Sequence, residues 1–311
     1  MQPGIGRLHY SLAATLMCAL SVSAQPRGGQ PQPEFVRQGQ DLVRQGKLDQ
    51  ALEIYRKELE KSPDSVPANN AAGIALDLMG RGDEARKHFA AAIKAAPTPQ
   101  AKANLQRAMA MSYAFESDCG NTIKYEQQVF DYHASESDFY QQGEMADEAA
   151  RVCIDAGDLD SAYKWYKIGH DIGLKEPGIK SDRVSLWNFR WKHAQARIAA
   201  RRGDKAEAQK HIAAAKAILD NDPEMAKAQA VFFPYLTGYV AFYSGDYKTA
   251  LVDLQKANQN DPFIQCLTAQ AYEKLGDKEH AMELYQRAAN SVSHNPPAAY
   301  ARPFARKKIR A

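Results

Sequence analysis

The sequence lacks the motifs by which most enzymes are identified. Its 311 residues contain no GxxxxGK[ST], GxGxxG, GxSxG or HExxH motif, and its eight histidines never pair at metal-ligand spacing. It also lacks an excess of one charge, because 40 basic and 37 acidic side chains give a formal net charge of +3. This balance argues against a nucleic-acid-binding protein. We therefore expect a chain that is not an enzyme and has no cofactor, no metal ion and no nucleic-acid partner.

Cysteine is scarce, with four residues in the whole chain and no CxxC motif. That absence argues against a zinc ribbon and against a thioredoxin-like redox motif. Cys18 lies near the N-terminus, and Cys119, Cys153 and Cys266 follow. If the protein is exported and loses its N-terminal segment with Cys18, three cysteines remain. Three cysteines permit one disulfide and leave one thiol free.

Long apolar runs are missing as well. Arg7 precedes an uncharged run at residues 11–22, which is shorter than the roughly 20 apolar residues that span a bilayer. Val22-Ser23-Ala24 has the small-residue spacing of a signal-peptidase site. We interpret residues 1–24 as a signal peptide cleaved after Ala24, with an uncleaved amphipathic leader as the alternative. The mature chain would then be periplasmic or secreted, without a transmembrane segment, and residues 25–34 would form a flexible linker.

What the chain does contain is an internal repeat. Residues 46–63 and 80–97 both begin with glycine and end with proline, and matching positions are 34 residues apart. The matching pairs are Gly39 and Gly73, Gly46 and Gly80, Ala51 and Ala85, Tyr55 and Phe89, and Pro63 and Pro97. Helix-length stretches flank each inner glycine, so each unit reads as two helices joined at a glycine turn. Small residues would let the helix backbones approach, and large residues would fill the space beside them.

This pattern resembles the tetratricopeptide repeat, a pair of helices with a period of 34 residues. One mark of the repeat is an alanine followed four positions later by a large side chain. This mark recurs at Ala51, Ala85, Ala162, Ala208, Ala250 and Ala281, each time five residues after a glycine. A seventh, weaker copy has Thr122 and Glu126 at the mark and Ser117 in place of the glycine. The resemblance implies an all-α, α-α superhelix of about seven repeats over residues 35–294, and a protein or peptide partner.

Residues 295–311 carry five basic side chains and follow the last repeat. We interpret them as a C-terminal capping helix over the exposed end of the solenoid. A basic tail for an anionic lipid or polymer is the alternative.

Two helix-length stretches suggest a binding surface. Residues 231–243 contain no charged side chain and place Phe232, Tyr235, Tyr239 and Phe242 on one helical face. Residues 183–202 place Arg190, His193 and Arg197 in one stripe. Because first helices line the concave surface in the family, the resemblance implies that these seven residues adjoin there. We predict a groove for a partner peptide.

The alternative is that these residues are structural. The aromatic face would then be covered by neighbouring helices or the terminal helix, Glu144 and Asp147 would pair with the arginines, and folded partners would dock on outer or edge surfaces. Some relatives bind acidic C-termini through basic and asparagine side chains on three first helices. The matching positions here are Val36, Gln40, Ala71, Asn104 and Ala108, so that clamp is absent. Family geometry also implies a Cys119–Cys153 disulfide, with two packed thiols as the alternative.

Overall fold

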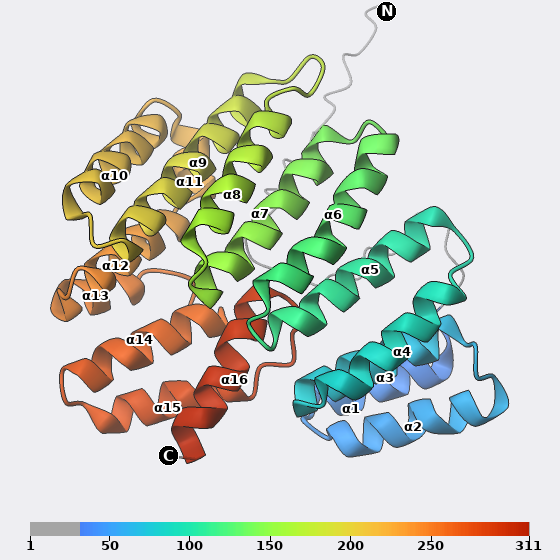
Figure 1. Cartoon of the computed structure of the whole chain (residues 1–311). Helices are drawn as coiled ribbons and strands as arrows, with labels where there is room; N and C mark the ends of the chain where they lie inside the picture. The colour runs from blue at the N-terminus through green and yellow to red at the C-terminus, as the bar shows by residue number, and fades with distance from the viewer. Residues whose placement is uncertain (1–31, 311) are drawn as a thin grey trace, which may run out of the picture.

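The structure is a computed structural model that describes residues 32–310, and within this range it forms sixteen α-helices (Figure 1). The first eight are α1 (Glu34–Arg44), α2 (Leu48–Lys61), α3 (Val66–Met79), α4 (Gly82–Lys94), α5 (Pro99–Ala114), α6 (Cys119–Ser135), α7 (Phe139–Ala156) and α8 (Leu159–Gly173). The others are α9 (Ser181–Arg201), α10 (Lys205–Asp220), α11 (Pro223–Ala228), α12 (Phe232–Tyr243), α13 (Tyr247–Leu254), α14 (Pro262–Lys274), α15 (Lys278–Ala289) and α16 (Pro296–Arg310). The expected signal peptide and linker residues 25–31 lie outside the described range, and the first helix begins at Glu34.

Seven helical hairpins are present in this range: α1–α2, α3–α4, α5–α6, α7–α8, α9–α10, α12–α13 and α14–α15. Six of their turns contain the repeated glycine in a left-handed conformation, which a side chain rarely adopts. The six are Gly46, Gly80, Gly157, Gly203, Gly245 and Gly276. In the third hairpin, Ser117 takes the same conformation with φ of 58°. The predicted seven-unit α-α superhelix is therefore confirmed.

An aspartate directly after Ser117, or directly after the turn glycine, starts most of the second helices. Asp118, Asp158, Asp204, Asp246 and Asp277 each accept a hydrogen bond at the helix N-terminus from the backbone N–H three residues later. Such a cap satisfies one of the amide groups that the first turn of a helix leaves without an intrahelical partner. The glycine ends one helix and the aspartate begins the next, so this short segment sets each hairpin.

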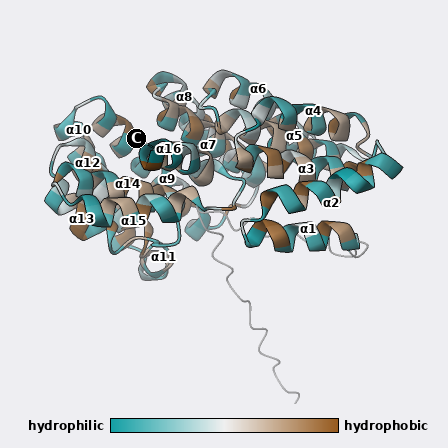
Figure 2. Ribbon diagram, turned by 90° about the horizontal axis from the view of Figure 1, so that it is seen from below, coloured by the Kyte–Doolittle hydropathy of each residue, from teal (hydrophilic) through white to brown (hydrophobic). Residues whose placement is uncertain are grey.

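Small and large residues face each other across the hairpins as the repeat pattern predicts. A methyl group at Gly39 would lie 2.3 Å from the Tyr55 ring, and one at Gly73 would lie 2.6 Å from the Phe89 ring. Both rings are almost completely buried. Glycine is therefore needed at these positions because the aromatic ring occupies the space of a side chain. Figure 2 shows hydrophobic and hydrophilic residues alternating along the helices instead of gathering in one part of the chain.

The third hairpin is the weakest copy in sequence but keeps the same packing. Thr122 and Glu126 occupy the positions of alanine and the large residue, and both are fully buried. Burial, reinforced by the nearby Glu148 carboxylate, raises the pKa of Glu126 well above its usual range. A buried carboxyl group thus fills the place that a large apolar or aromatic side chain takes in the other units.

The terminal helix does more than cover the last repeat. Helix α16 packs on α14 and α15 and also contacts α5 and α7, so it lies between the last repeat and the first half of the array (Figure 1). Of the helices described, none combines the length and the apolar character needed to cross a bilayer.

Candidate functional site

The seven residues predicted to line a peptide groove are buried in the structure. None has more than 9% of its surface exposed, and Tyr239 is fully enclosed. The seven are Arg190, His193, Arg197, Phe232, Tyr235, Tyr239 and Phe242. This burial contradicts the expectation of an open groove over the fifth and sixth hairpins, and it agrees with the structural alternative.

Two later helices close over the aromatic face of α12. The Phe263 ring of α14 lies 6.1 Å from the Tyr235 ring and 6.3 Å from the Tyr239 ring, between centroids. Tyr300 of α16 packs in turn on Phe263, at 5.1 Å. These rings form one aromatic stack across three helices, because the superhelix curves tightly enough to bring α14 and α16 against α12. Phe242 turns the other way, toward Tyr247 of α13 at 5.5 Å.

The basic side chains along α9 all contact other residues inside the protein. Arg190 forms an ion pair with Glu144 of α7, and Arg197 Nη2 donates a hydrogen bond to Tyr166 Oη at 2.7 Å. His193 lies beside the Tyr235 ring at 5.4 Å. Burial, with the charge of Arg197 adding to it, lowers the pKa of His193 well below its usual range, so the imidazole is neutral.

Asp147 of α7 faces the same arginines. Desolvation raises its pKa to about 7, although the charges of Arg190 and Arg197 act in the opposite direction. The Glu144–Arg190 pairing that the structural alternative required is present, whereas Asp147 Oδ2 is buried without a hydrogen-bond partner.

Two charged residues of this cluster, Arg151 and Asp155 of α7, were not predicted from the sequence. Arg151 pairs with Asp155 at 3.3 Å, and its guanidinium lies 4.5 Å above the Phe263 ring. With Asp147 they form a stripe at steps of four residues along one face of α7, and that spacing is a signal that could have found them. The whole cluster joins α7, α9, α12 and α14. Its chemistry is that of a buried polar network that holds these helices in place.

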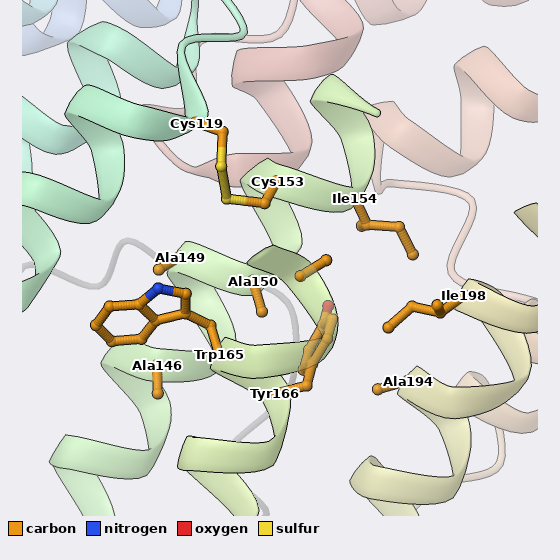
Figure 3. Close-up of a cluster of buried hydrophobic side chains, with 11 residues drawn as sticks. Cys119, Ala146, Ala149, Ala150, Cys153, Ile154, Trp165, Tyr166, Ala194 and Ile198 are labelled. Carbon is orange, nitrogen blue, oxygen red and sulfur yellow. A yellow bond between two sulfur atoms is a disulfide. The ribbon is translucent and has the colours of Figure 1, made fainter. Parts of the chain in front are cut away.

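Cys119 and Cys153 are joined by a disulfide, as the resemblance implied (Figure 3). It links the start of α6 to α7 across 34 residues of sequence. The bond borders a buried cluster in which Trp165, Tyr166 and Ile198 pack around alanines of α7. Cys266 is the remaining cysteine of the described range, and it is buried as a free thiol.

The C-terminal segment packs against the ends of α3 and α5 in the first hairpins. His294 Nε2 lies 2.8 Å from Asp77 Oδ2, and the His294 ring packs against Phe115 at 5.4 Å and Phe89 at 5.8 Å. Ser112 Oγ donates to the other oxygen of Asp77 at 2.7 Å. The last residues of the chain are therefore anchored more than 200 positions away in the sequence, at the end of α3.

Two arginines of α16 complete this anchor. Arg302 Nε and Arg306 Nη1 donate to the same acceptor, the Leu78 carbonyl oxygen, at 2.8 and 2.9 Å. Carbonyl groups in the last turn of a helix have no intrahelical partner, so the two guanidinium groups cap α3 from outside. Part of the basic charge that suggested a lipid- or polymer-binding tail thus serves an internal contact.

A cavity of about 610 Å³ lies beside this anchor. Its wall comes from the turn between α3 and α4, the end of α5, and one side of α16. No residue of the predicted groove contributes to it. Sequence reasoning missed this site because the segments that build it are far apart in the chain.

Comparison with known proteins supports the repeat architecture. Residues 36–110 match one tetratricopeptide repeat family model, and residues 264–291 match another. The human protein O-mannosyl-transferase TMTC2 is 35% identical over 90 residues, which are 29% of this chain and 11% of that protein. The chain therefore spans only a small part of that relative.

Among solved structures, the apo form of RapI superposes with a TM-score of 0.53 at 11% identity, over 89% of this chain and 97% of that one. A tetratricopeptide repeat protein from Parabacteroides merdae ATCC 43184 superposes with a TM-score of 0.49 at 13% identity, over 89% and 96%. At these identities the likeness concerns the fold alone. Two segments of this chain thus match tetratricopeptide repeats, and its described part folds as an α-α superhelix of the tetratricopeptide type.

Proposed function

We propose that this protein is a non-enzymatic scaffold of the cell envelope that binds partner proteins through its outer and edge surfaces. The observation that carries the proposal is that the seven residues predicted to line a peptide groove are buried within the repeat superhelix. Their aromatic and arginine side chains contact neighbouring helices in the second half, and the C-terminal segment packs against the ends of α3 and α5 in the first half. A partner that needed the concave side would have to displace these buried contacts, whereas the outer helices and hairpin turns remain accessible.

Placement in the envelope is part of this proposal. It is supported by the apolar run at residues 11–22, which is followed by small residues before position 25. A disulfide between Cys119 and Cys153 also fits an oxidising compartment. The N-terminal residue of the exported protein provides the test. Mass spectrometry of the N-terminal peptide should find a chain that begins at Gln25, as glutamine or as pyroglutamate, and a retained Met1 would refute cleavage after Ala24.

The non-enzymatic character rests on the absence of catalytic motifs from the sequence and on the match to repeat models. The transferase activity in the name of the human relative belongs to a protein of which this chain covers 11%. We carry none of that activity over to this chain.

Site-specific photocrosslinking tests where partners bind. A photoreactive residue would replace Tyr163, Val252 or Met282, which are exposed apolar side chains on the second helices α8, α13 and α15. The same residue at the α3–α4 turn would probe the edge. We expect reproducible protein adducts from at least one of these positions in the native envelope. Their absence at every position would refute docking on these surfaces.

Conservative interior variants provide the control. Tyr235→Phe and Tyr239→Phe keep the aromatic packing and remove only a hydroxyl group. If the superhelix binds through its outer and edge surfaces, both variants should keep the same adducts. Loss of the adducts in a variant whose circular dichroism is unchanged would show that partners bind on the concave face instead.

A further inference from the structure

The cavity beside α16 has the size of a ligand-binding site. Its volume of about 610 Å³ falls within the range of about 300 to 1,000 Å³ that is usual for such sites. Met79, Phe115 and Pro303 provide apolar wall, and Gly80 and Gly82 contribute no side chain. A ligand chain can therefore approach the backbone at Gly80 closely, because a methyl group added there would meet no atom within 4 Å.

Four cations of α16 line the same cavity: Arg302, Arg306, Lys307 and Arg310. Among the described residues, none of the four forms an ion pair with a carboxylate, and the ion pair that α16 does make uses Lys308. Arg302 and Arg306 contact carbonyl oxygens instead. Lys307 and Arg310 are exposed. The wall formed by α16 thus carries positive charge that the protein does not neutralise.

The titration of the two inner arginines agrees with this geometry. Burial, with the charge of Arg306 adding to it, lowers the pKa of Arg302 to about 10. Burial and the charge of Arg310 lower the pKa of Arg306. In both arginines burial is the larger cause, and a neighbouring arginine of α16 adds to it.

The two carboxylates of the cavity wall are engaged elsewhere. Asp77 is enclosed by Ser112 and His294, with a contact at each oxygen. Glu116 pairs with Arg86 at 3.1 Å, and its Oε1 lies against Gly82, where a methyl group would come within 2.3 Å of it. Among the described residues, neither carboxylate forms an ion pair with a cation of α16, so the positive wall remains available to an external anion.

We propose that this cavity binds an extended acidic segment of a partner protein, with carboxylates at alternate positions. Arg306 and Arg310 stand four residues apart on one helix, which corresponds to a rise of about 6 Å, and the buried Arg302 lies one such step before them. In an extended chain, side chains two residues apart on the same face are separated by about 6.6 Å. The cation spacing of α16 therefore matches the carboxylate spacing of such a segment, while the intervening side chains meet Met79 and Phe115.

This geometry distinguishes a peptide from a compact anion. A phosphate group is best held by donors that converge on one point, whereas these cations extend along two turns of helix. The apolar wall also offers contact area that inorganic phosphate cannot use. The inference rests on the proposed function, since it names the chemistry of a partner for the edge surface.

Fluorescence anisotropy with a labelled ten-residue peptide of alternating glutamate and valine tests the proposal. We expect saturable binding to the full mature chain that weakens as salt concentration rises, because exposed ion pairs are screened. A peptide with glutamine in place of glutamate should not bind. Inorganic phosphate and vesicles containing phosphatidylglycerol are the competing anions, and neither should displace the peptide at matched charge concentration.

The key variant is Lys307→Glu with Arg310→Glu, which reverses two exposed cations and leaves the Leu78 caps intact. It should weaken peptide binding about tenfold or more. The matched control is Lys164→Glu with Lys248→Glu, which makes the same change in net charge at exposed positions of α8 and α13. The control should stay within about twofold of the unchanged protein.

Equal binding by both double variants would overturn the proposal, as would displacement of the peptide by phosphate or vesicles. Absence of peptide binding to the unchanged protein would overturn it as well. Photocrosslinked partners that survive in the Lys307→Glu, Arg310→Glu variant would refute this cavity while leaving the scaffold function in place. Loss of all partner adducts from the unchanged protein would refute both.

Discussion

Two different kinds of contact hold the two halves of the superhelix in place. In the first half, a separate piece of chain does so, because Val292 and Ala299 pack with Ile74 and Leu78 of α3 and Met111 of α5. In the second half, side chains of the first helices themselves meet, as Tyr235, Tyr239 and Phe263 do. The contacts that hold the first half lie at a few anchor points, whereas those of the second half are distributed through the core. A single change should therefore be more damaging at an anchor than at most positions of the second half.

His294→Ala tests the anchor and should have the largest effect. The Asp77 side chain has no exposed surface, and removing its imidazole partner leaves a buried carboxylate with Ser112 as its remaining hydrogen-bond donor. Breaking a buried pair from one side costs about 3 to 5 kcal/mol. Urea unfolding of His294→Ala should show this loss in the free energy of unfolding. Asp77→Asn combined with His294→Ala should recover part of it, and a fully additive loss in the double variant would contradict the pairing.

Asp147→Asn probes the second half through the pH dependence of stability. The folded-state pKa is raised from 3.8 to about 7 by burial, so the carboxyl group stabilises the fold fully below about pH 4. That contribution falls as pH rises from about 4 to about 7, at up to about 1.4 kcal/mol per unit. Chemical unfolding of the unchanged protein should therefore lose stability over this window faster than the asparagine variant. Parallel curves for the two proteins would refute a raised pKa at Asp147.

The disulfide lies where the two halves meet, between the third and fourth hairpins. Closing a loop of 34 residues stabilises a fold by about 2 to 4 kcal/mol, mainly by restricting the unfolded chain. Cys119→Ser with Cys153→Ser should lower the free energy of unfolding by that amount. Thiol titration of the unreduced, unfolded mature chain should find one reactive group, Cys266. Three reactive groups would show that the bond is absent.

Gly173→Ala should have a smaller effect, again in the second half. A methyl group at Gly173 would lie 2.1 Å from the Trp187 indole, which is itself buried against Gly143. Overpacking of this kind costs about 1 to 3 kcal/mol. Gly120→Ala is the control, because its methyl group would meet no atom closer than 3.6 Å. It should be neutral or stabilising by up to about 1 kcal/mol. Equal thermal midpoints for the two variants would contradict the tight contact.

The repeat was predictable from sequence because its determinants are local. A left-handed glycine, an aspartate cap and a small residue opposite a ring recur within each unit, and each acts on neighbours in the chain. The Cys119–Cys153 pairing followed once adjacent units were placed in register. The partner-binding residues could not be predicted in the same way. An uncharged helix such as residues 231–243 has the same pattern whether a neighbour or a partner covers it.

What the sequence determined by itself is the number of hairpins, their turns and the spacing that stacks them. What only the tertiary structure decided is which surfaces remain open. Curvature brings α14 and α16 over α12 and closes the predicted groove. Contacts between Leu78 and Arg302, separated by 224 positions, place the terminal helix against the first half and create the cavity. Small rotations between units add up along a solenoid, so the meeting of distant segments depends on the whole array and on no single repeat.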